Sequence, residues 1–350
     1  MTLLVSYSGV LGGAERILLD WGAAVPDPLL ACPNGPLAAA ARAAGFEVVV
    51  LPERSLRFRG APVSAARALG ALARDVSTLV ERRRPPAIVA SGRRPVLACA
   101  LARRRGVPVV AIHNDLPTGP ALERAVRWAT ARCDAVVALS ATVARTVGPR
   151  ARVIHPGVDL AHWRPTPLPA EPRALVLGAL VPWKRADLAL EVAARVPGLR
   201  LEIAGATLPG DPPDFERGLR ARAGRPDLAG RVTFAGALAD PRPALARARL
   251  LLHCADREPY GLVLVEALAS GRPVVAPGAG GPAEILAGGG GRLYRPGDPD
   301  DAAAAIRAVL ASPGDPRARA EAFDGAAAAR RFGAVVEAVR VAAPRPAWRP

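Results

Sequence analysis

The sequence predicts two successive doubly wound α/β domains, each built on a parallel β-sheet with helices on both faces. Short runs of Val, Leu, Ile and Ala alternate with Ala/Leu/Arg-rich helical stretches along the whole chain, which is typical of βαβ units. The strand-like runs are apolar throughout, as expected of parallel strands covered on both sides. At 350 residues the chain is too long for one ordinary core, so we expect two domains.

The first domain is expected to span residues 1–165. Its helices are predicted at residues 13–23, 36–44, 62–83, 95–105, 120–131 and 141–147, and its strands at 2–7, 47–51, 87–90, 107–112, 135–138 and 152–155. Arginine runs at 82–84 and 103–105 come at the ends of two of these helices, where positive charge favours the helix dipole.

The second domain, residues 174–331, restarts the same alternation. Before it, four prolines within residues 164–173 block helix and strand pairing alike, so we expect residues 166–173 to be the linker. Residues 332–350 are expected to form a C-terminal helix and tail that packs back on the first domain. Strands are predicted at 174–178, 200–204, 231–235, 249–253, 273–276 and 292–294, and helices at 184–195, 214–223, 241–247, 261–269, 282–286 and 299–311.

The chain carries a strong excess of positive charge. It has a formal net charge of +16, and Lys184 is its single lysine among 47 basic residues. Residues 1–170 contribute 22 Arg against 11 acids, or +11, and the rest contribute +5. This charge favours an anionic partner, such as a nucleotide, lipid head groups or nucleic acid, although an arginine-rich composition would also produce it.

Composition and cysteine spacing exclude several classes of protein. An apolar fraction of 51% excludes a disordered chain, and no apolar run reaches the roughly 18 residues of a membrane span. The four cysteines include no Cys-x-x-Cys pair, so we expect no metal site, and scattered buried thiols fit a reducing cytoplasm. Residues 1–7 have no basic region before their apolar run, which argues against a signal peptide. We therefore expect a cytoplasmic protein.

Two glutamates with seven residues between them give the strongest local signal. Glu258 stands in a loop after a strand, Tyr260, Gly261 and Leu262 lead into a helix, and Glu266 lies inside that helix among apolar residues. A buried glutamate is costly unless it meets hydrogen-bond donors, and the hydroxyls of a ribose are such donors. The alternative is that Glu266 lies on an exposed helix face and Glu258 is a loop charge.

Two further segments of the second half could bind phosphate. Gly280 and Gly281 belong to a glycine-rich turn that leads into a helix, and amides at a helix start bind anions. Lys184 and Arg185 stand at a strand-to-helix junction, where positive charge opposes the helix dipole and so indicates an anionic ligand such as a pyrophosphate. An ordinary loop and a solvated helix start are the respective alternatives.

The first half offers two candidate segments. Gly12, Gly13 and Glu15 lie in a glycine loop between a strand and a helix, but their spacing is not that of the dinucleotide-binding fingerprint. His113, Asn114 and Asp115 end a strand, where a side chain is expected to point into the cleft between the domains. Histidine there could bind a sugar hydroxyl or accept a proton, and the alternative is a capping turn.

In this order, the segments resemble the retaining glycosyltransferases of family 4, which have the GT-B fold of two Rossmann-like domains facing across a cleft. The resemblance covers nearly the whole chain and rests most on the pair Glu258 and Glu266. It also includes Gly12-Gly13-Ala-Glu15, Ala138-Leu-Ser140, residues 153–159, Leu180-Val-Pro-Trp-Lys184 and Gly280-Gly281-Pro-Ala-Glu284. One departure is Ala179, where the family usually carries an arginine that grips the diphosphate; Arg185 or Arg257 could compensate.

The resemblance implies an enzyme that moves a sugar from a UDP- or GDP-sugar to a cell-envelope, lipid or small-molecule acceptor without a metal or other cofactor. It implies that Glu258 binds the donor sugar and Glu266 the ribose. Lys184 would hold the diphosphate with Arg185 and the amides of Gly12, Gly13, Gly280 and Gly281. His113, Lys184 and Glu258 would form the catalytic set, while Glu15, Asn114 and Asp115 would lie on the acceptor side.

Other functions remain open from the sequence. A basic nucleic-acid-binding protein fits the charge, but no known nucleic-acid-binding motif is visible, so no specific nucleic acid is expected. A nucleotide-sugar epimerase, an inverting transferase or a binding protein without transferase activity would share the fold. The basic first domain could also associate peripherally with the anionic inner face of a membrane.

Overall fold

The computed structural model describes residues 1–53, 62–102, 106–208 and 213–342. The chain divides into two compact units, one of Met1–Pro156 together with the chain from Ala326 onward, the other of Gly157–Gly325. Both carry parallel sheets, so the two Rossmann-like α/β domains predicted from the sequence are confirmed. The run at 103–105 lies outside the described residues.

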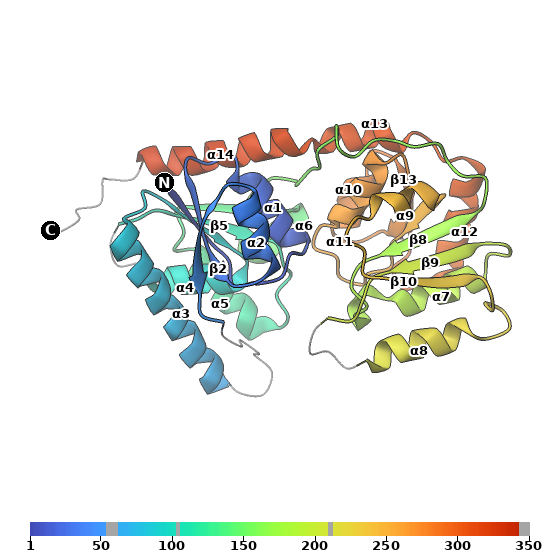
Figure 1. Cartoon of the computed structure of the whole chain (residues 1–350), viewed down its shortest axis with the longest axis horizontal. Coiled ribbons are helices and arrows are strands. Elements are labelled where there is room, and N and C mark those ends of the chain that lie inside the picture. Colours follow the sequence, from blue (N-terminus) through green and yellow to red (C-terminus); the bar gives the residue numbers. More distant parts are fainter. Residues whose placement is uncertain (54–61, 103–105, 209–212, 343–350) are drawn as a thin grey trace. The chain divides into compact units, whose positions relative to one another are not determined.

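The described part of the first unit contains a seven-stranded parallel sheet in the order β3-β2-β1-β4-β5-β6-β7 (Figure 1). The strands are β1 (Thr2–Val5), β2 (Pro28–Pro33), β3 (Glu47–Leu51), β4 (Ile88–Ser91), β5 (Val109–His113), β6 (Ala135–Ala138) and β7 (Arg152–Val153). The helices are α1 (Gly13–Gly22), α2 (Pro36–Ala43), α3 (Pro62–Arg83), α4 (Arg93–Ala102), α5 (Pro120–Thr130), α6 (Ala141–Val147) and α14 (Gly325–Ala342).

Side chains of alternate residues in β1 enter different cores, which explains why its sequence is apolar throughout. Leu3 and Val5 belong to the core that α3 and α4 cover. Leu4 faces α1, where a Cβ added to Gly22 would lie 2.7 Å from the Leu4 Cδ1 atom. All of β1 is buried, as expected of a parallel strand with helices on both faces.

The terminal helix α14 packs within the first unit. The rings of Phe332 and Trp21 of α1 stack with their centroids 4.9 Å apart, and a Cβ on Gly333 would lie 2.6 Å from the Ala24 carbonyl oxygen. The helix begins at Gly325, earlier than the residue 332 expected from the sequence.

The described part of the second unit contains a six-stranded parallel sheet in the order β10-β9-β8-β11-β12-β13. The strands are β8 (Arg173–Leu177), β9 (Arg200–Ala204), β10 (Val232–Gly236), β11 (Leu250–Leu252), β12 (Val274–Pro277) and β13 (Gly291–Tyr294). The helical segments are η1 (Pro182–Lys184), α7 (Ala186–Ala194), α8 (Asp214–Ala223), α9 (Arg242–Arg247), α10 (Leu262–Ala269), α11 (Gly280–Leu286), α12 (Pro299–Ala311), α13 (Pro316–Ala320) and η2 (Glu321–Phe323).

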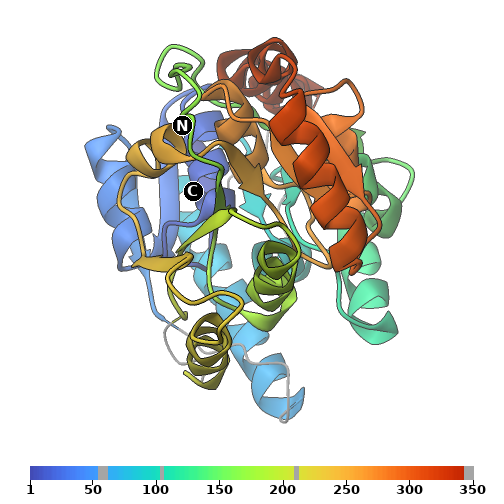
Figure 2. The same ribbon diagram turned by 90° about the vertical axis from the view of Figure 1, so that its right-hand side faces the viewer.

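Helices α7 and α12 lie side by side over one face of this sheet (Figure 2). Leu188 and Val192 of α7 and Ile306 of α12 share a buried core with Leu201 and Leu252 of the strands. Helix α12 begins at residue 299, as predicted, and Asp298 caps it, because its carboxylate accepts hydrogen bonds from the Asp300 and Asp301 amides.

Two arginines, Arg272 and Arg317, bind backbone carbonyl groups of the irregular segment that precedes β8. Arg272 has no exposed surface, and its guanidinium donates hydrogen bonds to the carbonyl oxygens of Thr166 (2.6 Å), Pro167 (3.1 Å) and Ala248 (3.3 Å). Arg317 donates to the Trp163 carbonyl oxygen at 2.6 Å. Residues 166–173, expected to link the two domains, therefore lie inside the second unit.

One strand of the first sheet was not predicted. β2 begins and ends with proline, and its sequence, Pro28-Leu-Leu-Ala-Cys-Pro33, is flanked by further turn residues. Proline is tolerated at the ends of a strand, where no ladder hydrogen bond is lost, so these residues did not exclude the strand. The four cysteines are free and buried, as expected.

Candidate functional site

Two loops of the second unit meet where the strand order of its sheet reverses. β8 pairs in parallel with β11, and the chain leads from β8 to Lys184 and from β11 to Glu258. Open α/β sheets bind their ligands at the carboxyl ends of strands at such a reversal. The Lys184 ammonium contacts the Glu258 carboxylate, so two residues predicted from separate motifs meet at this edge.

Lys184 is held at the end of the short helix η1. Its Nζ atom lies 4.3 Å from the centroid of the Trp183 ring, and its side chain retains 22% of its exposure. The Asp256 amide donates a hydrogen bond of 3.0 Å to the Trp183 carbonyl oxygen. This bond ties the Lys184 loop to the Glu258 loop, so the two charged groups are positioned by the backbone.

Arg185, expected beside Lys184 as a second cation for an anionic ligand, is engaged within the protein. Its Nε atom lies 3.0 Å from Asp187 Oδ2, and a terminal nitrogen lies 3.0 Å from Asp256 Oδ1. Its backbone adopts the left-handed conformation, with φ of 54°, between η1 and α7. The two carboxylates balance the charge of the guanidinium, which fastens the loops together.

Glu258 is a buried carboxylate with two nitrogen neighbours. Its residue is 8% exposed, and Oε2 lies 3.3 Å from His253 Nε2 in addition to its contact with Lys184. Burial alone would raise the pKa of Glu258, but His253 and the charge of Lys184 outweigh it and lower the pKa to about 2. Glu258 is therefore ionised at neutral pH.

Glu266 is also buried, with 7% of its surface exposed. The alternative interpretation, in which it lies on an exposed helix face, is therefore wrong. It lies in α10, which begins after Gly261. Gly261 has a φ of +99°, a conformation that favours glycine, and a Cβ there would lie 3.0 Å from Leu264 Cδ1. Tyr260 is buried beside this turn, and Leu262 is half-buried. Both predicted acids thus lie inside the unit, on either side of one tight turn.

The glycine pair at the start of α11 has a packing role. A Cβ on Gly280 would lie 2.5 Å from the Glu258 carbonyl oxygen, and one on Gly281 would overlap with the Tyr260 backbone. The Gly281 amide donates a hydrogen bond of 3.0 Å to the Glu258 carbonyl oxygen. These glycines allow α11 to approach the loop at residues 258–260, and the Gly281 amide, expected to bind phosphate, already has a protein partner.

The first unit has a polar cavity at the corresponding edge of its own sheet. The cavity has a volume of about 190 Å³ and lies where β1, β4 and β5 end. The strand order reverses between β1 and β4, so this edge is also a site where ligands bind in such sheets. The cavity unites the three residues expected on the acceptor side; its polar lining includes Glu15, Ser91, Arg93, Arg94, Asn114 and Asp115.

Donors and acceptors of hydrogen bonds are balanced in this polar cavity. Arg93 Nε lies 3.1 Å from Asp115 Oδ2. Glu15 Oε2 accepts a hydrogen bond of 3.1 Å from the Gly12 amide and so caps α1. Next to it, Gly13 is exposed, and a Cβ there would meet nothing within 4 Å. Ser91 is 8% exposed and lines the same cavity.

His113 is placed differently from the expectation. Its residue is 1% exposed, and its Nε2 atom lies 2.9 Å from the hydroxyl of Thr130 in α5. The Thr130 hydroxyl donates to the Val126 carbonyl oxygen at 2.7 Å, so it accepts the imidazole N–H. Burial lowers the pKa of His113 to about 4 and keeps it neutral. The side chain thus packs under the helix that covers this end of β5, while Asn114 and Asp115 line the cavity.

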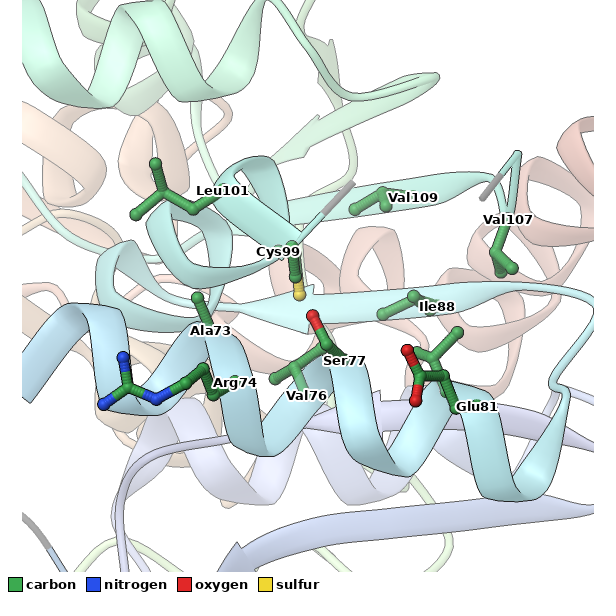
Figure 3. Close-up of a pocket in the computed structure, with 12 residues that line it drawn as sticks. Ala73, Arg74, Val76, Ser77, Glu81, Ile88, Cys99, Leu101, Val107 and Val109 are labelled. Atoms are coloured by element: carbon green, nitrogen blue, oxygen red, sulfur yellow. The ribbon is translucent and has the colours of Figure 1, made fainter. Parts of the chain in front are cut away.

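A larger cavity in the first unit lies away from the sheet edge that binds ligands. It has a volume of about 370 Å³ and lies between α3 and α4, where Ser77 and Cys99 point toward each other (Figure 3). Ile88 and Val109, the first residues of β4 and β5, form part of its wall, so it is at the amino ends of these strands. Its position and apolar floor set it apart from the candidate site.

The described ranges contain neither a candidate membrane span nor a candidate metal site. Among residues 1–53, 62–102, 106–208 and 213–342, no helix combines the length and the apolar character needed to cross a bilayer. No group of three or more His, Cys, Asp or Glu side chains in those ranges is arranged to hold a metal ion.

Several residues at these sheet edges were not predicted as site residues. His253 is one of them, because nothing in the sequence indicates its contact with Glu258, five residues later. Ser91 and Arg93 end β4 and begin α4. A strand-to-helix junction at the reversal of the strand order would have indicated both, but the strand order is not readable from the sequence.

Comparison with known families accounts for both units. The model described as "Glycosyltransferase Family 4" matches residues 11–162, and the model described as "Glycosyl transferases group 1" matches residues 162–325. The two matches adjoin each other and together include every candidate residue of both sheet edges.

Individual relatives are similar over part of the chain. A D-inositol 3-phosphate glycosyltransferase of Mycobacterium marinum is 37% identical over 181 residues, which are 47% of this chain and 38% of that protein. The protein of the same description from Mycobacterium avium is 35% identical over 196 residues, or 52% and 46% of the two chains. The chain thus spans less than half the length of these relatives.

Among solved structures, Anabaena Alr3699/HepE, determined in complex with UDP and glucose, is similar over almost the entire length. The TM-score is 0.81 at 23% identity, covering 96% of this chain and 99% of that one. At this identity the similarity concerns the fold.

Proposed function

Because the chain belongs to family 4 of the glycosyltransferases, we propose that it transfers a sugar from a nucleoside diphosphate sugar to a hydroxyl group, with retention of the anomeric configuration. The observation that carries the proposal is the contact between Lys184 and the buried Glu258 at the strand reversal of the second unit. A cation and an ionised carboxylate at one ligand-binding edge match the two ends of a sugar diphosphate.

In this proposal the donor binds to the second unit. The Lys184 ammonium turns from Glu258 to the diphosphate, Glu258 accepts hydrogen bonds from hydroxyls of the donor sugar, and Glu266 accepts them from the ribose. HepE has been determined with UDP-glucose, which favours a UDP-sugar as the donor, and a GDP-sugar is the alternative. The Gly13 and Gly280 amides are proposed to assist at the phosphates, whereas the Gly12 amide already donates to Glu15 Oε2.

The chemical step requires stabilisation of the leaving group. The bond between the anomeric carbon and the β-phosphate oxygen breaks, and its electron pair stays on that oxygen. Lys184 stabilises the new negative charge, and a positioned charge in a water-poor site is effective in this role. The acceptor oxygen bonds to the anomeric carbon from the same face, and its proton passes to the departing phosphate oxygen. Glu258 acts here by orienting the sugar.

The polar cavity of the first unit is proposed to bind the acceptor. Its lining includes two guanidinium groups and two carboxylates, so hydroxyl groups of a ligand would find both donors and acceptors. This balance suits a polyhydroxylated acceptor better than a purely anionic one. The Ser91 side chain, which lines this cavity, would offer such a ligand a hydroxyl.

A thermal-shift panel of UDP-, GDP-, ADP- and TDP-sugars tests the proposal. A donor present at a hundred times its Kd should stabilise the wild-type protein by about 2.7 kcal/mol. Glu266→Ala should fold but lose most of that shift, while Glu53→Ala, which removes an exposed carboxylate of the first unit, should keep it. A panel without any shift would refute the proposal, and DNA binding that falls steeply with salt would favour a nucleic-acid-binding protein.

A further inference from the structure

His253 occupies a fixed position directly after β11. Its amide donates a hydrogen bond of 2.8 Å to the Val275 carbonyl oxygen, and its own carbonyl oxygen accepts one of 3.0 Å from the Tyr294 hydroxyl. The residue is 5% exposed. The backbone is therefore held from the neighbouring strand and from β13, and the imidazole has little freedom to move.

The imidazole of His253 faces the carboxylate of Glu258. Its Nε2 atom lies 3.3 Å from Glu258 Oε2, yet it is buried and forms no hydrogen bond of ordinary geometry with any described residue. Burial lowers the pKa of His253, so the ring is neutral. A neutral ring with its proton on Nε2 would direct an N–H toward the carboxylate.

Lys184 competes for the same oxygen. It contacts Glu258 Oε2, the atom that also faces His253, and in the described residues no hydrogen bond reaches Oε1. In the proposed function Lys184 turns to the diphosphate when the donor binds. Glu258 would then be a buried carboxylate whose remaining side-chain neighbour among the described residues is His253. An unpaired buried charge is strongly unfavourable.

We propose that His253 is a positioning residue, which holds the Glu258 carboxylate through Oε2 once Lys184 has turned to the diphosphate and leaves Oε1 for the donor sugar. This inference rests on the proposed function. It assigns His253 a role that depends on the sugar and not on the nucleotide, because Glu258 faces the sugar while Lys184 holds the diphosphate.

The test is to compare binding of UDP and UDP-glucose to three variants by calorimetry, with GDP and GDP-mannose as a second pair. His253→Leu removes the N–H at similar size, His253→Gln keeps an N–H donor, and Tyr294→Phe removes the hydroxyl that holds the same backbone without changing the Glu258 contact. Loss of a hydrogen bond to a charged group should weaken sugar-nucleotide binding about tenfold or more.

We expect His253→Leu to weaken UDP-glucose binding at least about tenfold while UDP binding stays within about twofold. His253→Gln should restore most of the loss, and Tyr294→Phe should not discriminate between the ligands. Equal losses for both ligands in His253→Leu, or no loss, would overturn the inference while leaving the proposed function intact. If the wild-type protein binds neither pair of ligands, the inference and the proposed function are both contradicted.

Discussion

The Lys184 ammonium and the Glu258 carboxylate are in contact at the strand reversal of the second unit, although 74 residues separate them in the chain. The contact brings together two loops, each fixed by its own strand and by the bond between Asp256 and Trp183. An ion pair in such a position is a preformed arrangement of opposite charges that a bound donor would separate. The coupling between these residues should therefore be measurable without a ligand.

A double-mutant cycle measures that coupling. Lys184→Met leaves a buried carboxylate without its cation, and Glu258→Gln leaves the cation without its carboxylate. We expect each single change to destabilise the second unit, and the double variant to be less destabilised than the sum, with a coupling of about 1–3 kcal/mol. Urea unfolding followed by a probe in the second unit, such as Trp183 fluorescence, gives the three values. Strictly additive changes would contradict the contact.

The depressed pKa of Glu258 predicts a loss of stability in acid. A carboxylate with a folded pKa of about 2 and an ordinary value of 4.5 stabilises the fold above pH 4.5, and that contribution is lost as the pH falls toward 2. The full difference corresponds to about 3 kcal/mol. The stability gap between wild type and Glu258→Gln should therefore be largest near neutral pH and close in this window. Glu53→Gln, at an exposed carboxylate, should show no comparable gap.

The sequence predicts the fold well because its signals are local. Apolar runs and proline or glycine boundaries fixed nearly every strand and helix, and the exceptions have local causes. β2 is enclosed by prolines, and α13 is a five-residue helix without a clear periodic pattern. The first residue of the second unit could not be predicted in this way. The segment before β8 belongs to that unit because Arg272 and Arg317 bind its carbonyl groups, and these are long-range contacts.

The sequence predicts those residues of the candidate site that belong to local motifs, but not the contacts between them. Glu258 and Glu266 were predicted as a glutamate pair around a helix start, and Lys184 from positive charge at a strand-to-helix junction; the structure brings Lys184 and Glu258 into contact and buries Glu266. The contacts between the two loops could not be predicted, because Lys184 meets Glu258 and Arg185 meets Asp256 only through the pairing of β8 with β11. The contact of His253 with Glu258 is local, but it depends on how the loop after β11 folds, which the sequence does not indicate.

Arg272 should be essential for the stability of the second unit. Its guanidinium is fully buried and binds three backbone carbonyl oxygens, which Arg272→Met would leave without donors. Buried acceptors that lose their partners cost about 1–3 kcal/mol each, so we expect a loss of about 3 kcal/mol or more. Arg292→Met, at an exposed arginine of β13, should stay within about 0.5 kcal/mol. Chemical denaturation of both variants compares them; similar small losses would show that the Arg272 bonds contribute little.

Two glycine-to-alanine substitutions should separate packing from ligand binding. Gly281→Ala forces a Cβ against the Tyr260 backbone, so we expect a clear fall in Tm. Gly13→Ala meets nothing within 4 Å, so its Tm should stay the same, while donor turnover should fall if the diphosphate lies against the Gly13 amide. Scanning calorimetry and a donor-consumption assay give both values. Unchanged turnover in Gly13→Ala would remove this amide from the proposed phosphate site.

An arginine at residue 179 should strengthen donor binding. Glycosyltransferases of family 4 usually carry an arginine at this position, where this chain has Ala179. Ala179 lies after β8 in the loop that leads to Lys184, and its carbonyl oxygen accepts a hydrogen bond of 3.0 Å from the Val181 amide. Arg185 does not replace the missing cation, because Asp187 and Asp256 engage it. A charge-assisted hydrogen bond from a new arginine contributes about 1.5–3 kcal/mol, so Ala179→Arg should tighten UDP binding about tenfold or more.

Calorimetric titration with UDP checks this gain, and Ala206→Arg is its matched control. Ala206 is exposed, and its carbonyl oxygen accepts a hydrogen bond from the Leu180 amide, so the control adds the same charge close to the same loop. A general attraction between an added positive charge and UDP would tighten binding in both variants and weaken with salt. A specific contact with the diphosphate should tighten binding only in Ala179→Arg. Equal affinities in the two variants would show that residue 179 does not face the diphosphate.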